Sequence, residues 1–241
     1  MEEKIYTIPI MDGFNSESTC PFCFMEEKLH KDSLDYILGP AYMEDDIREK
    51  TDKLGFCKVH LDELYKEQNR LGLALMEYTH LVKINKILGE LFNNINFNEK
   101  KGLFKKNSNL KEIQEFLKTT ESSCYVCEKI ESTLERYIYS FFYLLKKDKE
   151  FKEVFLNSKG FCFSHFSRLI EDCGKYLKSA ELEDFIKELY NIQSKHFQKL
   201  EKDLDWFIKK FDYRYEKEPW YDSKEALSRT INMFNSKNGL E

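Results

Sequence analysis

The amino-acid sequence predicts an all-α protein built from a duplicated helical module, and three observations lead to this fold class. First, Gly and Pro are sparse, with 9 and 4 residues among 241, which removes the residues that most often interrupt helices. Second, apolar residues recur at intervals of three and four along several long segments, which is the spacing of one helical face. Third, a motif of three cysteines and one histidine occurs twice, which is typical of a repeated module.

The repeated motif consists of a Cys-x-x-Cys pair followed by Gly-Phe-Cys-x-x-His. The first copy contains Cys20, Cys23, Cys57 and His60, and the second contains Cys124, Cys127, Cys162 and His165. The two Cys-x-x-Cys pairs are 104 residues apart and the two histidines are 105 apart, so the register changes by one residue over the unit. Three thiolates and one imidazole suit tetrahedral zinc. We therefore predict that each copy carries a Cys3His site and that the chain binds two zinc ions.

The first copy of the module contains four predicted helices. Pro21 suits the first position of a helix, so a helix is expected to follow the Cys-x-x-Cys pair over residues 22–37. A shorter helix returns between residues 40 and 53, and a third opens at the Cys-x-x-His motif. Apolar residues at intervals of three and four then predict a long closing helix over 71–91.

The second copy repeats this order of helices. A helix is expected over residues 126–146, a shorter one over 149–159, and a third from Cys162. The longest apolar stripe, residues 182–211, predicts a closing helix about 45 Å long.

Two further segments complete the chain. The linker is rich in lysine and has a short helical pattern over 110–117, and the tail is dense in aromatic residues, with a final helix through Phe234. The predicted domains are a first repeat over 1–94, the linker over 95–123, a second repeat over 124–212 and the tail over 213–241.

The positions of the ligands relative to the helices have a chemical reason. Gly55 and Gly160 allow a left-handed turn before each Phe-Cys-x-x-His segment. The following cysteine and histidine then lie three residues apart on one helical face. Each cysteine pair lies at a helix N-terminus, whose positive end stabilises thiolates for metal binding and for redox chemistry alike.

Helix lengths bear on how the ligands pair. In the first copy, an outward helix of about 24 Å and a return of about 21 Å bring the Cys-x-x-His motif back to the Cys-x-x-Cys pair. In the second copy, the outward helix is about 31 Å and the return only about 16 Å. Two solutions remain for this mismatch: a break in the helix, or an exchange of ligands between the copies.

Other chemistry competes with zinc for the same residues. A thiolate-rich ligand set can hold an iron–sulfur cluster or act in dithiol redox chemistry, although no βαβ pattern supports a thioredoxin-like site. Glu27-x-x-His30 and Glu77-x-x-His80 match the ligand spacing of di-iron bundles, but chance matches are expected among 43 acidic residues. Cys173 has no counterpart in the first copy and is expected to be a buried free thiol. No catalytic residue is predicted.

Composition restricts the location and the partners. The net charge of −5 argues against a general nucleic-acid-binding protein. The first 14 residues include Glu2 and Glu3 without a continuous apolar stretch, and no apolar run is long enough to cross a membrane. We therefore expect a cytoplasmic protein with reduced thiols and no membrane association. The linker lysines and the aromatic tail are candidate surfaces for a protein partner.

Beyond the repeated motif, three segments resemble an uncharacterised bacterial family known as a domain of unknown function. They are residues 3–9, 69–75 and 203–214, and together with the motif they extend the resemblance over nearly the full chain. The resemblance implies a family of similar length, found chiefly in anaerobic Gram-positive bacteria, and it supplies no activity. Some members carry a transporter-binding label, which this sequence does not support because it has no export signal or lipidation motif.

Two functional hypotheses follow from these observations. The leading one is a non-enzymatic cytoplasmic protein whose two structural zinc sites hold an interaction surface, because four protein ligands leave no open position for a substrate. The alternative is a redox protein or sensor that uses the same cysteines for iron–sulfur clusters or for reversible oxidation.

Overall fold

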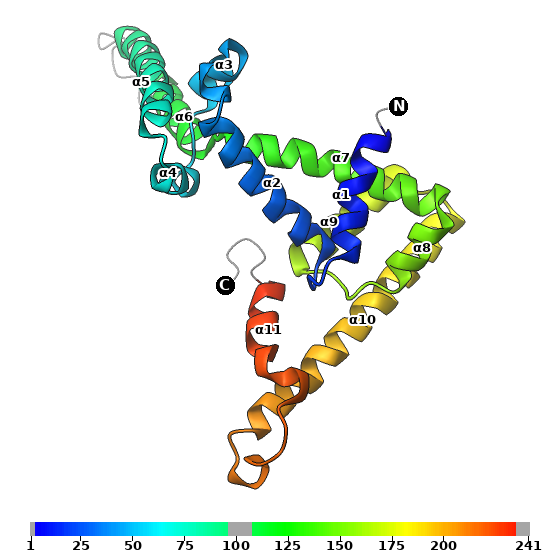
Figure 1. Cartoon of the computed structure of the whole chain (residues 1–241). Coiled ribbons are helices and arrows are strands. Elements are labelled where there is room, and N and C mark those ends of the chain that lie inside the picture. Colours follow the sequence, from blue (N-terminus) through cyan, green and yellow to red (C-terminus); the bar gives the residue numbers. More distant parts are fainter. Residues whose placement is uncertain (1–2, 96–107, 235–241) are drawn as a thin grey trace, which may run out of the picture. The chain divides into compact units, whose positions relative to one another are not determined.

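The computed structural model describes residues 3–95 and 108–234, and all regular structure within these ranges is helical (Figure 1). The all-α prediction is therefore confirmed. The α-helices are α1 (Glu3–Asn15), α2 (Pro21–Leu38), α3 (Asp45–Leu54), α4 (Lys58–Lys66), α5 (Arg70–Asn93), α6 (Ser108–Ser122), α7 (Tyr125–Lys147), α8 (Lys149–Leu156), α9 (Phe163–Tyr176), α10 (Ala180–Lys209) and α11 (Ala226–Phe234). Three short 3-10 helices are η1 (Ala41–Met43), η2 (Tyr213–Tyr215) and η3 (Tyr221–Glu225).

The helices predicted from apolar spacing are present, with small shifts of their ends. The longest is α10, with 30 residues, and the short linker pattern over 110–117 is the middle of α6. Helix α7 runs over 23 residues as one element, so the break that the helix lengths left open is excluded. Helix α1 has no predicted counterpart, because Pro9 lies inside it and conceals the helical pattern.

The chain divides into two compact units that interleave along the sequence. Unit 1 combines Met1–Lys28 with Thr133–Glu241, and unit 2 is Leu29–Ser132. The boundaries fall inside α2 and α7, so each of these helices begins in one unit and ends in the other. This division differs from the consecutive ranges inferred from the sequence, in which each copy of the motif formed its own domain.

Unit 1 has an aromatic core. Its fully buried side chains include seven phenylalanines, namely Phe22, Phe141, Phe142, Phe151, Phe155, Phe161 and Phe185. Phe141 of α7 is central, with its ring 5.8 Å from Phe151 and 5.5 Å from Phe155 of α8, both edge to face. Each buried phenylalanine contributes about 1.5–3 kcal/mol of hydrophobic stabilisation, and well-oriented ring pairs add to it. This core joins the start of α2 to α7, α8 and α10.

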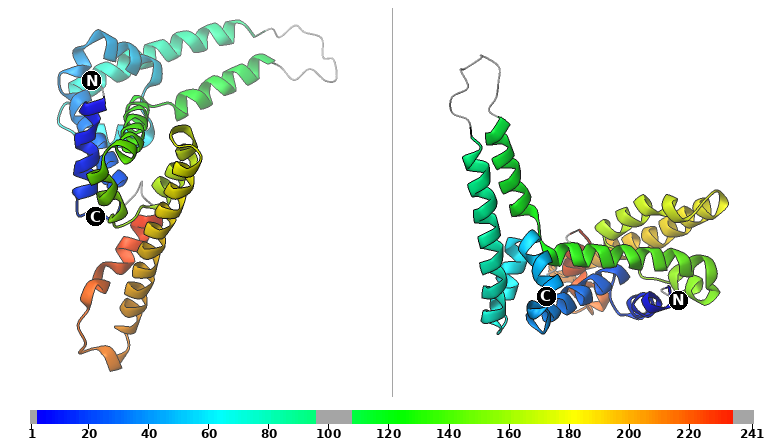
Figure 2. Two further views of the ribbon diagram at one scale, coloured as in Figure 1. Left: turned by 90° about the vertical axis from the view of Figure 1, so that its right-hand side faces the viewer. Right: turned by 90° about the horizontal axis from the view of Figure 1, so that it is seen from above.

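The tail of unit 1 folds back on the long helix α10. Figure 2 shows α11 beside α10, and the Trp206 indole donates a hydrogen bond to the carbonyl of Pro219 at 3.0 Å. The Lys210 ammonium donates to three backbone carbonyls of the same tail, those of Tyr215, Glu216 and Glu218. These contacts hold the tail against α10, while the side chains of Phe211, Tyr213 and Tyr221 remain exposed.

Unit 2 packs around α5. Helix α3 lies along α5, and α6 runs beside α5 (Figure 2). The guanidinium of Arg48 on α3 donates to the carbonyl of Leu75 and to the hydroxyl of Thr79 on α5, both at 2.9 Å. Asn69 caps α5, since its side-chain oxygen accepts from the backbone N–H of Gly72 at 2.9 Å. These contacts fix the return of the chain from α3 through α4 to α5.

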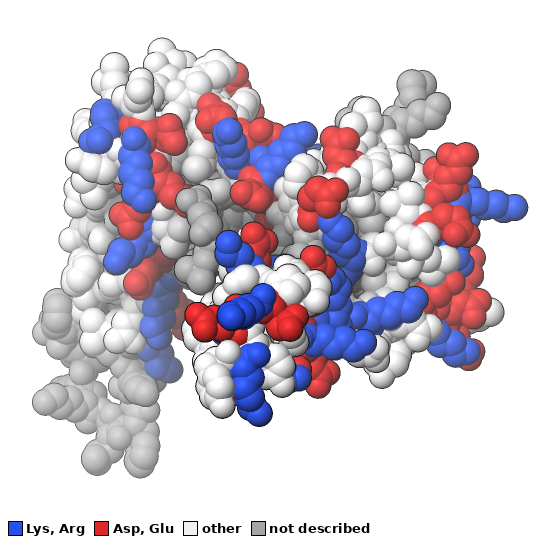
Figure 3. Space-filling model, turned by 60° about the horizontal axis from the view of Figure 1, so that its bottom comes forward, with Lys and Arg blue, Asp and Glu red and all other residues white. Residues whose placement is uncertain are grey.

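The surface charge and the helix composition agree with the composition of the sequence. Acidic and basic side chains are interspersed over the face drawn in Figure 3, which suits the small net charge of the chain. Within residues 3–95 and 108–234, every helix is too short or too polar to cross a membrane.

Candidate metal centres

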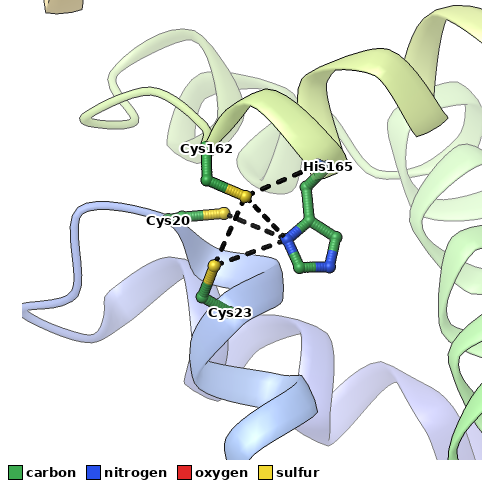
Figure 4. A group of neighbouring side chains, drawn as sticks. All are labelled: Cys20, Cys23, Cys162 and His165. Carbon is green, nitrogen blue, oxygen red and sulfur yellow. Dashed lines mark hydrogen bonds between the residues drawn. The ribbon is translucent and has the colours of Figure 1, made fainter. Parts of the chain in front are cut away.

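The structure gathers four predicted ligands of unit 1 into one cluster, here called site A (Figure 4). Its members are Cys20, Cys23, Cys162 and His165. Cys20 precedes α2 and Cys23 lies in its first turn, whereas Cys162 caps α9 and His165 lies in the first turn of α9. The His165 Nδ1 lies 3.6, 3.4 and 3.1 Å from the sulfurs of Cys20, Cys23 and Cys162, respectively. The tetrahedral edges of a zinc site are about 3.5–3.8 Å, so small movements would accommodate an ion.

Site A is enclosed by protein. Cys20, Cys162 and His165 are 2%, 3% and 4% exposed, and Cys23 is half-buried. The ring of Phe22, which belongs to the aromatic core of unit 1, stacks on the imidazole of His165 at 5.6 Å. The site is thus continuous with that core.

The turn before α9 is held by groups outside the motif. Gly160 has φ of 120°, a conformation that favours glycine, and a Cβ at this position would lie 2.7 Å from the Cβ of His196. The buried side chain of Gln193 accepts from the backbone N–H of Phe161 at 3.0 Å and donates to its carbonyl at 2.9 Å. Gln193 and His196, both on α10, therefore fix the backbone that presents Cys162.

The electrostatics of site A favour a cation at its centre. Hydrogen bonds from Cys20 and Cys23, and then from His165, lower the pKa of the Cys162 thiol. Burial alone would lower the pKa of the His165 imidazole, but its contacts with Cys162 and Cys20 outweigh burial and raise it to about 10. The surroundings that stabilise a positive charge on the imidazole would also stabilise a metal ion, which would bind in place of the imidazole proton.

A second cluster in unit 2, here called site B, contains the other four predicted ligands. Its members are Cys57, His60, Cys124 and Cys127. The His60 Nδ1 lies 3.2, 3.3 and 3.4 Å from the sulfurs of Cys57, Cys124 and Cys127, respectively. His60 and Cys124 are 7% and 4% exposed, Cys57 is half-buried and Cys127 is exposed. Site B has the donor set of site A with one open side.

Backbone contacts join the two segments that form site B. The Tyr125 N–H donates to the carbonyl of Gly55 at 3.0 Å, and the Ser123 hydroxyl donates to the carbonyl of Leu54 at 2.7 Å. Gly55 has φ of 58°, and the ring of His80 covers it closely. The start of α7 is therefore fixed against the turn that precedes α4.

The pKa of the clustered histidine shifts in opposite directions at the two sites. Burial, followed by the neighbouring His30, lowers the pKa of the His60 imidazole, which favours the neutral form that binds metals. Burial, followed by the charge of Cys124, raises the pKa of Cys127 to about 12. At site A, hydrogen bonds with Cys162 and then Cys20 likewise raise the pKa of the Cys23 thiol, so metal binding would displace thiol protons at both sites.

The pairing of the ligands corrects one expectation from the sequence. Each site combines the Cys-x-x-Cys pair of one copy with the Cys-x-x-His motif of the other copy, so the within-copy closure expected for the first copy is wrong. The exchange between copies, which the helix lengths left open, is the arrangement found. Helix α2 is about 27 Å long and its return helix α3 about 15 Å, and the mismatch is larger between α7 and α8.

Each clustered histidine has polar neighbours that the sequence did not indicate. The Glu26 carboxylate lies 3.4 Å from His165 Nε2. At site B, the His30 ring lies 5.2 Å from the His60 ring, and His30 Nε2 is 2.8 Å from the Glu63 carboxylate. Such groups orient a ligating imidazole and fix its tautomer. The sequence contains no clear indication of these neighbours, because neither arrangement repeats in the other copy.

Two other histidines share one structural role. His80 and His196 each cover the glycine before a Phe-Cys-x-x-His segment. A constant repeat spacing of 105 residues would pair His80 with Phe185. In the structure its counterpart is His196, because the segments after the two motifs differ in length. His80 therefore supports the backbone, and the described residues do not assemble the di-iron arrangement that Glu77-x-x-His80 could have indicated.

Cys173 stands apart from both clusters, as expected. It is 5% exposed, and its thiol donates to the carbonyl of Ile170 at 3.0 Å. All seven cysteines are free thiols in this structure.

The fold and the two clusters define an all-α protein with paired Cys3His centres compatible with metal binding. The chain belongs to a family of unknown function, DUF6062, which matches residues 1–239. This confirms the resemblance drawn from the sequence. No curated protein and no solved structure matches the chain.

The contact between Glu26 and His165 gives a first testable expectation. Glu26→Gln should weaken metal binding at site A about 10–100-fold, because the neutral amide stabilises the ligating imidazole less. A chelator competition titration would resolve this change in one of the two metal equivalents. Glu27→Gln is the matched control, since Glu27 is the neighbouring exposed residue and should leave both equivalents unchanged. Equal behaviour of the two variants would contradict a role for Glu26 at the site.

Proposed function

We propose that this chain is a cytoplasmic zinc protein in which two structural Cys3His sites hold a helical scaffold that contacts a protein partner. The observation that carries the proposal is the assembly of all eight predicted ligands into two compact four-ligand clusters. Cysteines that served only as core residues would have no reason to converge on a histidine nitrogen twice.

The donor sets favour a structural role over catalysis. Four protein ligands complete the tetrahedral coordination of zinc, whereas catalytic sites keep one position for water or substrate. At both sites each ligand lies at a helix start, so one ion would hold two helix N-termini together. Free cysteines suit a reducing compartment, which supports the cytoplasmic assignment.

Zinc is the metal that these donors suit best. Three thiolates with one imidazole are a common set for structural zinc, whereas iron–sulfur clusters are more often held by four cysteines. Because thiolate-rich sets also accept iron–sulfur clusters, the redox alternative uses the same residues.

Anaerobic purification followed by elemental analysis and visible spectroscopy tests this proposal. We expect two equivalents of zinc per chain and no absorption in the visible range. Visible absorption with stoichiometric iron would replace the proposal by the iron–sulfur alternative, and trace metal in fully reduced protein would refute metal binding.

Exposed apolar side chains support a scaffold with a protein partner. On α5 in unit 2, Leu71, Tyr78 and Leu81 are 67%, 66% and 65% exposed. In the tail of unit 1, Phe211 and Tyr213 are 76% and 85% exposed. Large apolar side chains, and aromatic ones above all, are favoured anchors in protein interfaces. Substituting these exposed side chains should leave the metal content unchanged. An effect of the substitutions on partner binding would then be separate from any effect on metal binding.

A further inference from the structure

We propose that Cys127 is a site of oxidative modification by peroxides, with Cys57 as the thiolate that resolves it, so that site B releases its metal while site A retains its own. The inference rests on the proposed function, since it requires a metal at both sites. It assigns different behaviour to two clusters that have the same donor set.

Accessibility is the first difference between the clusters. Cys127 is the exposed cysteine of the eight-ligand set, whereas each cysteine of site A is buried or half-buried. A peroxide must reach the sulfur along the line of the oxygen–oxygen bond, so oxidation follows exposure as well as thiolate character. Coordination to a metal keeps the sulfur in the thiolate form. Cys127 would therefore combine both requirements.

The surroundings of the clusters are the second difference. Site A is continuous with the aromatic core of unit 1, where Phe22 stacks on His165 and the Gly160 turn is held by Gln193. Opening site A would expose buried rings. At site B, the sulfurs of Cys127 and Cys57 lie on the more open side of the cluster, 3.9 Å apart.

The chemistry balances in two steps. The Cys127 thiolate attacks one oxygen of hydrogen peroxide, the oxygen–oxygen bond breaks, and the products are a sulfenic acid and hydroxide. The Cys57 thiolate then attacks the sulfenic sulfur, hydroxide leaves, and a disulfide forms between Cys57 and Cys127. The two thiolates lose two electrons and the peroxide gains them. Only Cys124 and His60 would remain as ligands, so the ion dissociates.

The experiment uses the full chain loaded with two equivalents of zinc, in the Cys173→Ser background to leave six thiols. Substoichiometric hydrogen peroxide is added in the presence of a chromogenic zinc indicator, and disulfides are mapped by mass spectrometry. We expect loss of one of the two zinc equivalents, a disulfide between Cys57 and Cys127, and reduced cysteines at site A. A thiol reductant with added zinc should restore the second equivalent.

Each other outcome overturns the inference. Simultaneous loss of both equivalents, or loss from site A first, would refute the difference between the clusters. A bridge between Cys124 and Cys127 would refute Cys57 as the resolving thiolate. A starting chain without two zinc ions would instead refute the proposed function, so the two failures are distinguishable before the oxidant is added.

Discussion

Removal of metal from both sites is expected to lower the melting temperature by more than about 10 °C. A structural zinc ion contributes a binding free energy of about 10 kcal/mol or more to folding, which is comparable with the whole stability of many domains. At site A the ion would offset most of the charge of the thiolates that are packed beside Phe22 and the aromatic core. Without it, any thiolate left at the site would be buried without a compensating charge, which opposes packing of the same rings.

Calorimetry and near-ultraviolet circular dichroism would measure this effect in reduced protein, before and after chelation. The aromatic signal of unit 1 should decrease as the metal leaves, and tyrosine and tryptophan should become more exposed. Cys162→Ser should reproduce part of the effect, whereas Cys173→Ser, which changes a buried thiol outside both clusters, should retain both ions. Metal-free protein that melts at the temperature of the loaded protein, with unchanged dichroism, would contradict a structural role.

Paired substitutions should distinguish the exchanged ligand sets from sets confined to one copy. Cys57→Ser combined with Cys124→Ser removes two ligands of site B, so one zinc equivalent should be lost. Cys57→Ser combined with Cys20→Ser removes one ligand from each site, so both equivalents should be lost. Ligand sets within each copy would give the reverse result, because Cys57 and Cys20 would then share one ion.

Elemental analysis of the two double variants gives the readout, with the single variants as controls. Each single variant should lose about one equivalent, since every thiolate would be a direct ligand of the proposed ion. Circular dichroism of the Cys57→Ser, Cys124→Ser protein would establish that unit 1 remains folded. Loss of both ions from a folded Cys57→Ser, Cys124→Ser protein would show that the exchanged pairing is wrong.

The sequence was sufficient to predict the helices from α2 to α11 and the eight clustered residues, whereas α1 was missed. Helix and ligand spacing are local properties: Cys57 and His60 lie three residues apart on one turn wherever the chain goes next. The choice of which Cys-x-x-Cys pair joins which Cys-x-x-His motif is not a local property. It depends on where α2 and α7 lead, and the apolar pattern gives the length of a helix without its direction in space.

The neighbours of the clustered histidines were missed for a related reason. Glu26 corresponds to Ile130 in the second copy, and Glu63 corresponds to Arg168, so the repeat itself gives no indication of either carboxylate. Each interacts with a residue far away in the sequence or on another helix. Only the folded chain brings Glu26 to His165.

Each proposed metal ion would close a loop of chain between the two segments that supply its ligands. Because the ligands are exchanged between the copies, the loop closed at site B lies within the loop closed at site A. The inner loop spans 64 residues between His60 and Cys124, and the outer spans 139 residues between Cys23 and Cys162. Closing the outer loop first would cost only about 0.6 kcal/mol more for each doubling of length, but during synthesis the inner loop is completed first. A nascent chain would thus acquire its ions in a fixed order, and neither copy of the motif could be excised as an independent metal-binding module.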